Sequence, residues 1–185
     1  MLIDNTWTLF LDRDGVINID TPGDYCRNAD QFHLFETTLP AMKLFNDFFC
    51  KIVVVTNQRG VSKGIMTEED LKGIHAKMMS LVIPAGGRID KIYYCLDMDA
   101  ETSTHRKPKP GMAYDAQRDF PSIDFIKSIM IGNNISDMQF GKAVGMTTVF
   151  IDDRKERGGI KSEEMDFIFD NLLEFAHLLK VSNEK

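Results

Sequence analysis

Short runs of apolar and β-branched residues alternate along this chain with longer stretches of helical periodicity. The runs are Thr8–Leu11, 52–55, 92–96, 128–131 and 147–151. Buried strands separated by helices are typical of βαβ units, in which the strands are parallel and helices cover the sheet. The sequence therefore predicts an α/β fold, Rossmann-like in its three layers, with the strand that ends at Asp12 near the centre of a parallel sheet.

The helices are predicted from residue spacing and from signals at their ends. Apolar residues recur at helical spacing over 39–49 and over 163–179, and acidic residues follow Thr67, where they suit a helix N-terminus. Pro110 suits the first position of another helix, and Ser136 suits the cap of the helix that follows the fourth strand.

Length and charge restrict the functions open to the chain. Its 185 residues are expected to form one domain over residues 1–185. A net charge of −6 argues against nucleic acid as a partner, because binding to a phosphate backbone depends on Lys and Arg. A small phosphorylated metabolite needs only a few local cations, so it stays open as a partner.

The sequence also indicates a compartment. The three cysteines are too few for a disulfide framework, and the N-terminus shows no basic segment followed by an apolar run. No apolar stretch reaches the roughly 18 residues of a membrane span. We therefore expect a cytoplasmic protein that binds no membrane, with a monomer as the starting expectation for its oligomeric state.

The first polar motif is FLDRDGVIN, residues 10–18. Asp12 leaves the predicted strand, Asp14 follows it, and Gly15 allows a sharp turn. A carboxylate can attack phosphorus and carry the phosphoryl group covalently, while a second carboxyl group can protonate the leaving alcohol and later activate water. An isolated Asp-x-Asp is usually a polar turn, but the strand before it and the glycine after it favour catalysis here.

Two further motifs, TNQRGV (56–61) and IGNNISDM (131–138), also follow β-like runs. Thr56 offers a hydroxyl, and its loop offers backbone amides, to phosphoryl oxygens. Asn133 and Asp137 offer oxygen atoms, the ligands that Mg²⁺ prefers. Ordinary turns and helix caps have a similar composition, so each motif is weak evidence alone.

The remaining motif is RKPKPGM, residues 106–112. Lys107 and Lys109 are candidates to neutralise phosphoryl charge, and Arg106 is a candidate to grip a polar group or a second phosphate of the substrate. A solvated basic loop has the same composition, so the motif gains weight only beside the others.

Taken together and in their order along the chain (FLDRDGVIN, TNQRGV, RKPKPGM, IGNNISDM), the four motifs resemble those of the haloacid dehalogenase superfamily of phosphatases over residues 7–152. FLDRDGVIN, TNQRGV and RKPKPGM more narrowly resemble the group of heptose-bisphosphate and histidinol-phosphate phosphatases. The resemblance implies magnesium-dependent hydrolysis of a phosphomonoester through an aspartyl-phosphate. D-glycero-D-manno-heptose 1,7-bisphosphate is the leading substrate that it implies, and histidinol phosphate is the second. The spacing between the motifs leaves no room for a large cap domain.

The resemblance implies a role for each matching residue. Asp12 matches the nucleophile, and Asp14 matches the general acid/base. Thr56 matches the hydrogen-bond donor to the phosphoryl group, and Lys107 matches the lysine that neutralises its charge. The expected substrate-binding residues are Asn57, Gln58, Arg59 and Arg106. The expected metal ligands are Asp12, Asp14 through its backbone carbonyl, Asn133 and Asp137.

Two positions depart from the pattern of the group. The group usually has aspartate at the position of Asn133, so we expect weaker magnesium binding, with Asp137 holding the metal directly or through water. Many relatives also carry a zinc loop with Cys-x-His and Cys-x-Cys before the RKP motif. The corresponding residues here are Cys95, Asp97, Ser103 and His105. This is a poor zinc ligand set, so we expect no zinc.

Other classes of function stay open at this point. Asn133 supports the alternative of a catalytically weakened homologue that binds a phosphorylated metabolite, although a pure binder has no need of both Asp12 and Asp14. A nucleic-acid end phosphatase would share similar first motifs, but the acidic balance and the lack of a basic or aromatic-rich stripe argue against it. No function is predicted for His33, His75 and His177.

Overall fold

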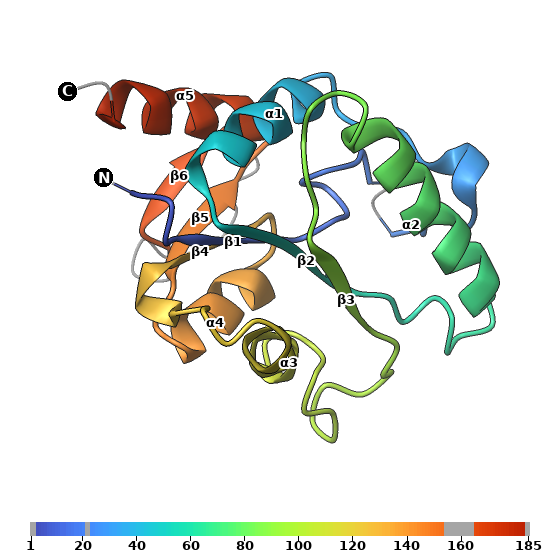
Figure 1. The fold of residues 1–185 in the computed structure, drawn as a ribbon. Helices are drawn as coiled ribbons and strands as arrows, with labels where there is room; N and C mark the ends of the chain where they lie inside the picture. Colours follow the sequence, from blue (N-terminus) through green and yellow to red (C-terminus); the bar gives the residue numbers. More distant parts are fainter. Residues whose placement is uncertain (1–2, 21–22, 154–164, 184–185) are drawn as a thin grey trace.

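The computed structural model describes residues 3–20, 23–153 and 165–183, and a six-stranded parallel sheet lies at its centre (Figure 1). The strands are β1 (Thr8–Leu11), β2 (Lys51–Asn57), β3 (Lys91–Cys95), β4 (Ser128–Gly132), β5 (Thr147–Ile151) and β6 (Phe167–Phe169). Their order is β3-β2-β1-β4-β5-β6, so β1 lies inside the sheet between β2 and β4. The predicted parallel sheet with a central first strand is confirmed.

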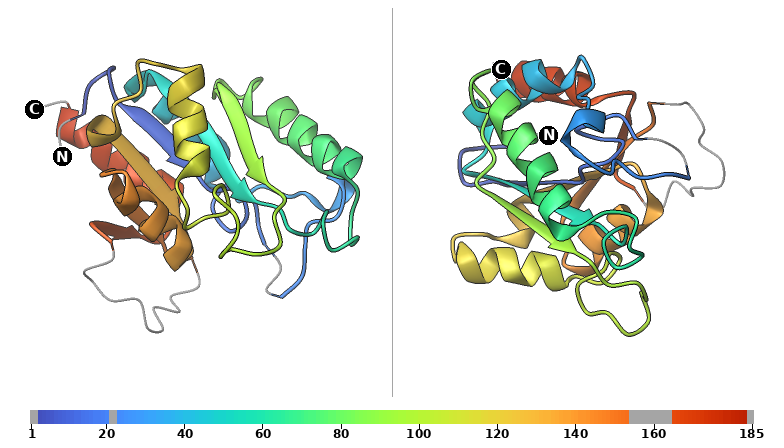
Figure 2. Two further views of the ribbon diagram at one scale, coloured as in Figure 1. Left: turned by 90° about the horizontal axis from the view of Figure 1, so that it is seen from below. Right: turned by 90° about the vertical axis from the view of Figure 1, so that its right-hand side faces the viewer.

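Helices cover both faces of this sheet, which gives the predicted three layers (Figures 1 and 2). The helices are α1 (Thr38–Phe48), α2 (Glu68–Val82), α3 (Gly111–Asp119), α4 (Ile135–Ala143) and α5 (Leu172–Asn183), with short 3-10 helices η1 (Ala29–Gln31) and η2 (Phe125–Lys127). Helices α1, α2 and α5 pack on one face, and α3 and α4 pack on the other. The residues that the structure describes include no cap domain above the sheet.

Alternation of side chains along β1 explains why both faces need a cover. Leu9 and Leu11 point into the core beneath α1, α2 and α5, whereas Phe10 points into the core on the side of α3 and α4. All three side chains are fully buried. Burying a side chain of this size contributes about 2 kcal/mol, so the strand that carries the first motif is held firmly from both sides.

The helix predicted over 163–179 is wrong in its first half. Within the described residues, 167–169 form β6, which pairs with β5, and α5 begins only at Leu172; residues 163 and 164 lie outside the described residues. Phenylalanine and isoleucine favour a strand where a sheet edge offers a partner, and the apolar spacing alone does not reveal that edge.

The predicted helix starts are close to the observed ones, with two corrections, at Pro110 and at Ser136. Thr67 caps α2 in a reciprocal pair with Asp70, and Pro110 takes the cap position one residue before α3. The cap of α4 is Asn134 rather than Ser136, because the Asn134 side chain accepts a hydrogen bond from the backbone N–H of Ser136. Ser136 itself lies in the first turn of α4.

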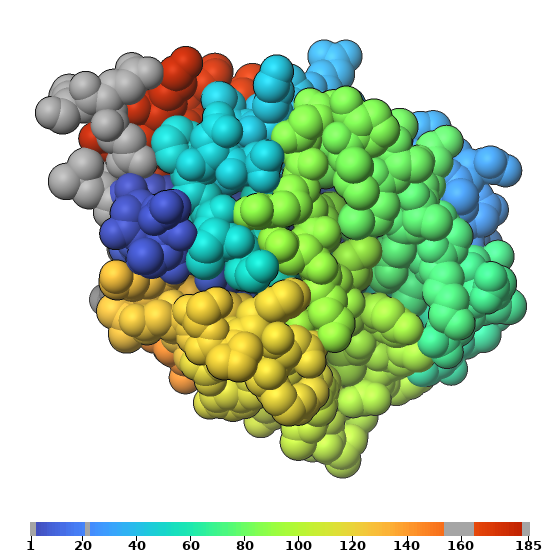
Figure 3. All heavy atoms as spheres, viewed as in Figure 1, coloured from blue at the N-terminus to red at the C-terminus, as the bar shows by residue number. Residues whose placement is uncertain are grey.

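The parallel arrangement brings the loops after successive strands to one edge of the molecule. The arrowheads of β2 and β3 point toward this edge in the left view of Figure 2. Figure 3 shows a face of the molecule other than this edge, on which α1 (cyan), α2 and β3 (green) and α3 (yellow) pack side by side. Of the helices in the described ranges, none is both long and apolar enough to cross a membrane.

Candidate active site

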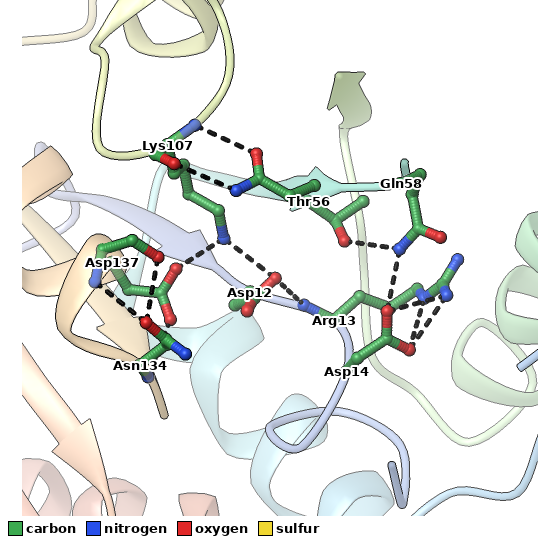
Figure 4. Close-up of polar contacts among 10 residues, drawn as sticks. Asp12, Arg13, Asp14, Thr56, Gln58, Lys107, Asn134 and Asp137 are labelled. Carbon is green, nitrogen blue, oxygen red and sulfur yellow. Dashed lines mark hydrogen bonds and ion pairs between the residues drawn. The ribbon is translucent and has the colours of Figure 1, made fainter. Parts of the chain in front are cut away.

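A buried lysine lies between two carboxylates at this edge (Figure 4). Lys107 Nζ is 2.9 Å from Asp12 Oδ1 and 2.6 Å from Asp137 Oδ1, and the side chains of Lys107 and Asp137 are each 1% exposed. Asp12 follows β1, Lys107 lies between β3 and α3, and Asp137 lies in the first turn of α4. Three segments far apart in the sequence therefore supply one charged cluster.

The cluster changes the protonation of its members. Burial, with the nearby charge of Asp137, raises the pKa of Asp12 to about 7, although Lys107 opposes that rise. Burial disfavours the ammonium form of Lys107, but the two carboxylates outweigh it and raise the lysine pKa. Lys107 therefore stays positively charged, and the site around Asp12 has more negative charge than one lysine can balance.

Asp14 is held on several sides. Burial alone would raise its pKa, but the Arg13 guanidinium and hydrogen bonds from Gln58 and Asn18 together lower it. Arg13 Nη2 donates to both carboxylate oxygens at 2.9 Å, and Arg13 Nε donates to Oδ1 at 3.1 Å. Asn18 Nδ2 donates to Oδ1 at 3.1 Å, and Gln58 Nε2 donates to Oδ2 at 2.8 Å. The carboxylate is thus fixed in orientation while its side chain stays 33% exposed.

The loop after β2 contributes through its amides as well as through a hydroxyl. Gln58 is 3% exposed, and its Nε2 bridges Asp14 and the hydroxyl oxygen of Thr56, to which it donates at 2.8 Å. Because the Thr56 oxygen accepts this bond, its own hydroxyl hydrogen is left to donate toward the cavity. Gln58 therefore orients two other predicted site residues.

Asn57 fastens the loop that carries Lys107. Its Nδ2 donates to the carbonyl of Lys107 at 3.1 Å, and its Oδ1 accepts from the N–H of Lys107 at 3.0 Å. A side-chain amide that pairs with both backbone groups of one residue fixes that residue's position. Asn57 was predicted to bind substrate, and it lines the cavity as well as holding this loop.

Two glycines let side chains of the motif IGNNISDM (131–138) approach the backbone. Gly15 has φ +75°, and a β-carbon there would lie 1.9 Å from Asn133 Nδ2. A β-carbon on Gly132 would lie 2.2 Å from that of Asp137. Asn133 is therefore packed against the turn after Asp14, and Asp137 is packed against the end of β4.

These groups open into a cavity of about 570 Å³. Asp12, Asp14, Thr56 and Lys107 line it, together with Asn133 and Asp137. Basic side chains from two loops line it too: Arg59 and Lys63 follow β2, and Arg106 follows β3. The predicted site residues are thus brought together, apart from Gln58, which is buried behind the lining.

The basic side chains of the cavity have few strong partners within the described residues. Arg59 Nε donates to the hydroxyl of Tyr25 at 2.9 Å, and Lys63 Nζ lies 5.5 Å from the centre of the same ring. Arg106 Nη1 donates to the carbonyl of Asp97 at 3.3 Å. No carboxylate forms an ion pair with Arg59, Lys63 or Arg106 in the part of the chain that the structure describes, so these cations are available for an anionic ligand.

Cys95, Asp97, Ser103 and His105, which correspond to the zinc loop of many relatives, contact one another or neighbouring residues. Ser103 Oγ donates to Asp97 Oδ2 at 2.6 Å and accepts from the backbone N–H of Arg106 at 2.7 Å, and Cys95 Sγ lies 3.7 Å from Ser103 Oγ. His105 Nε2 instead pairs with Asp115 at 3.0 Å. The absence of zinc stays a prediction. It is supported by a donor set with a single thiol, whose one imidazole pairs with Asp115.

The donor chemistry near Asp12 fits magnesium. The candidate ligands are carboxylate and amide oxygens from Asp12, Asp137 and Asn133. Burial and the nearby charge of Asp137 raise the pKa of Asp12, and a bound cation would favour its ionised form. Within the described ranges, no three His, Cys, Asp or Glu side chains are grouped to hold a metal unaided. Magnesium commonly keeps waters and binds substrate phosphate besides one or two carboxylates, so such a site is sufficient for it.

Sequence reasoning missed Arg13 and Lys63 as parts of this site. Arg13 is 1% exposed, although arginine is seldom fully buried without a partner. Its place between Asp12 and Asp14 in the motif was a signal that it could contact either carboxylate. Lys63 lies in the loop after β2 but outside the motif TNQRGV (56–61), so no motif marked it as a site residue.

Comparison with known proteins gives matches over nearly the whole chain. Residues 104–175 match a family model described as HAD-hydrolase-like. The chain is 35% identical over 170 residues to the D-glycero-alpha-D-manno-heptose-1,7-bisphosphate 7-phosphatase of Mycobacterium bovis, covering 92% of this chain and 90% of that protein. It is 32% identical over 180 residues to the D-glycero-beta-D-manno-heptose-1,7-bisphosphate 7-phosphatase of Neisseria meningitidis, covering 95% of each.

Among solved structures, the D,D-heptose 1,7-bisphosphate phosphatase from B. bronchiseptica complexed with magnesium and phosphate is similar in fold. The TM-score is 0.84 at 25% sequence identity, and the match covers 95% of this chain and 99% of that chain. Sequence and fold therefore agree on the same group of relatives.

Proposed function

We propose that this chain, which belongs to the heptose-1,7-bisphosphate 7-phosphatase family of haloacid dehalogenase-like hydrolases, removes one phosphate from a heptose bisphosphate with Asp12 as the nucleophile. The observation that carries the proposal is the buried contact of Lys107 with Asp12 and Asp137 beneath a cavity with basic side chains. A carboxylate held beside a cation is suited to attack phosphorus, because the cation offsets the repulsion between two anions.

In the first half of the reaction, an oxygen of Asp12 forms a bond to phosphorus while the bond from phosphorus to the sugar oxygen breaks. Lys107 balances charge on the phosphoryl oxygens, and the Thr56 hydroxyl donates a hydrogen bond to one of them. Asp14 takes up a proton from solvent as the substrate binds and gives that proton to the leaving sugar oxygen. A phosphate dianion beside Asp14 disfavours its ionised form, so substrate binding moves the pKa of Asp14 upward from its lowered resting value.

In the second half, Asp14 as a carboxylate takes a proton from water, and the water oxygen attacks phosphorus. The bond from phosphorus to Asp12 breaks, which releases phosphate and restores the Asp12 carboxylate. The three partners of Asp14, namely Arg13, Asn18 and Gln58, keep its carboxylate directed at the cavity through both halves.

Magnesium is the cofactor that the donor set supports, with Asp12, Asp137, Asn133 and the carbonyl of Asp14 as its holders. When bound, it polarises the phosphoryl oxygens and offsets the negative charge that surrounds Asp12. Asn133 contributes a neutral oxygen where an aspartate would contribute a charge, which is the reason to expect weaker binding.

A bisphosphate suits the remainder of the cavity. With one phosphate beside Asp12, the second has Arg59, Lys63 and Arg106 as candidate partners. Arginine can bind a phosphate through two parallel hydrogen bonds, and each such contact is charge-assisted. Relatives are named for both the alpha and the beta anomer, so both belong in the test.

Histidinol phosphate is the second candidate substrate. Its ammonium group would be repelled by the cationic side chains Arg59, Lys63 and Arg106. A bisphosphate, whose second phosphate these side chains attract, is therefore the better candidate. A homologue that only binds phosphorylated metabolites is the other alternative, and measured turnover separates it from an enzyme.

The decisive experiment measures phosphate release, with magnesium present, from both anomers of D-glycero-D-manno-heptose 1,7-bisphosphate and from histidinol phosphate. We expect turnover of the bisphosphate that disappears in Asp12→Asn, because an amide cannot attack phosphorus. Asp47→Asn, on the exposed surface of α1, is the matched control and should retain full activity. Substantial turnover by Asp12→Asn would overturn the mechanism.

A second experiment tests the proposed site for the second phosphate. Arg59→Gln and Arg106→Gln should each raise KM for the bisphosphate about tenfold, the loss of one charge-assisted contact, and should leave KM for p-nitrophenyl phosphate within twofold. Arg118→Gln, 71% exposed on α3, is the matched control. Equal effects on both substrates would mean that these arginines do not recognise a second phosphate.

A further inference from the structure

The side chain of His75 reaches the active site from a helix that carries none of the sequence motifs. His75 lies on α2 and is 8% exposed, in an apolar stripe with Leu71, Ile74 and Met78. Its Nε2 lies 3.2 Å from Arg13 Nη1. A buried polar ring in an apolar stripe costs free energy unless it has a partner, and its partner here is the guanidinium that holds Asp14.

The contact fixes the role of each atom. Arginine has only donors, so Nη1 donates and His75 Nε2 accepts. The imidazole must then be neutral, with its hydrogen on Nδ1. Burial, together with the Arg13 charge, lowers the pKa of His75 to about 4, which agrees with this neutral form.

Arg13 is therefore held from two directions. Nη2 and Nε face the Asp14 carboxylate, and Nη1 faces His75. Because the guanidinium is planar, the contact of Nη1 with His75 together with those of Nε and Nη2 with Asp14 fixes the plane of the group relative to α2. The ring of Tyr94 packs at 5.6 Å from the centre of the His75 ring, which limits rotation of the imidazole.

We propose that His75 is a positioning residue, whose neutral Nε2 sets the plane of Arg13 and thereby the orientation of the Asp14 carboxylate toward the leaving oxygen. This inference rests on the proposed role of Asp14 as acid and base. It links helix α2 to catalysis through two successive contacts, His75 to Arg13 and Arg13 to Asp14.

The test compares variants that keep or remove the acceptor. His75→Leu introduces an apolar side chain of similar size and so removes the acceptor, whereas His75→Gln keeps an acceptor oxygen. We expect His75→Leu to lower kcat about tenfold with KM within twofold of the wild type. The reason is that the Asp14 carboxylate, misplaced in this variant, acts in the transition state rather than in substrate binding. His75→Gln should restore kcat to within about threefold of the wild type. His177→Leu, exposed on α5, is the matched control and should leave both constants unchanged.

Thermal unfolding followed by circular dichroism is measured beside the kinetics, so that kcat is expressed per folded molecule. The inference is overturned if folded His75→Leu keeps the wild-type kcat, or if His75→Gln loses as much kcat as His75→Leu. Failure of the proposed function looks different, because Asp12→Asn would then retain turnover or the wild type would release no phosphate from any substrate.

Discussion

At the scale of single residues, the site is dominated by a charge imbalance among buried groups. Three carboxyl groups, those of Asp12, Asp14 and Asp137, lie beside two cationic side chains, Lys107 and Arg13. Each carboxylate is tolerated because it has a cationic neighbour within ion-pair distance, while isolated buried charges are strongly unfavourable. The effect of Asn133 is best understood in this setting, as one carboxylate fewer in an already crowded set.

Replacing Asn133 with aspartate should tighten magnesium binding. The added charge would attract the cation by a few kcal/mol at an effective dielectric near 20, and desolvation of the new carboxylate offsets most of that gain. We expect the magnesium concentration for half-maximal rate to fall about threefold to tenfold. Turnover need not rise in step, because the extra charge also repels the incoming phosphate.

The control for this change is Asn46→Asp, which adds the same charge at an exposed position of α1. The magnesium requirement of that variant should match the wild type at fixed substrate. An unchanged or higher requirement in Asn133→Asp would mean that Asn133 does not face the metal and that Asp137 alone serves there.

At the scale of elements, the helix that carries His75 depends on its first turn. Thr67 Oγ1 accepts from the N–H of Asp70 at 3.1 Å, and Asp70 Oδ2 accepts from the N–H of Thr67 at 2.8 Å. This reciprocal cap satisfies two donors that a helix leaves without partners. Three acidic residues in the same turn, Glu68, Glu69 and Asp70, add a favourable interaction with the helix dipole.

Thr67→Ala should therefore destabilise the protein without changing its chemistry. Loss of the cap hydrogen bond is worth about 1 kcal/mol in the free energy of unfolding. Urea denaturation should show this as a lower midpoint with an unchanged slope, and kcat should stay at the wild-type value. Thr67→Ser, which keeps the hydroxyl, serves as the control. A fall in kcat of folded Thr67→Ala would mean that the start of α2 also affects the site.

At the scale of the whole molecule, the sequence predicted the sheet well because its strands are marked by local signals. The bounds of β1 and β5 were predicted correctly, and the loops at the carboxyl ends of the strands do bring Asp12, Thr56, Lys107 and Asp137 together. These placements follow from short β-branched runs and from the geometry of parallel sheets.

The features that sequence reasoning missed depend on partners distant in the sequence. Strand β6 exists because β5 offers an open edge, and the helical spacing of its residues was therefore misleading. The contact of His75 with Arg13 joins residues 62 positions apart. No periodicity or motif in one sequence reveals such a pair, because it is created by how α2 packs on the sheet.

The stability of the whole protein should depend on pH through His75. Its pKa is about 6.5 in an unfolded chain and about 4 in the folded protein, where it is buried and faces Arg13 and, beyond it, Asp14. Between pH 6.5 and 4 the unfolded chain gains a proton at His75 and the folded protein does not. Stability is therefore unaffected above this window and falls as the pH drops through it, by at most about 3 kcal/mol.

Urea unfolding at pH 7, 6, 5 and 4.5 measures this effect in the wild type and in His75→Gln. Carboxylates titrate in both proteins and largely cancel in the comparison. The wild type should lose more stability than His75→Gln between pH 7 and pH 4.5. Parallel curves would mean that the imidazole is not kept neutral by folding.

Lys107 lies on a loop that Asn57 fastens, so we expect heat to act in two stages. The loop opens first and activity is lost, and the sheet unfolds only at a higher temperature. The loop between β3 and α3 is held at Lys107 by two side-chain hydrogen bonds and two ion pairs, whereas Met98 within it is 52% exposed. Such loops open at lower free energy than the core of a sheet. Amide hydrogen exchange should therefore become fast in this loop at temperatures where the strands remain protected, and activity should vanish there and return on cooling.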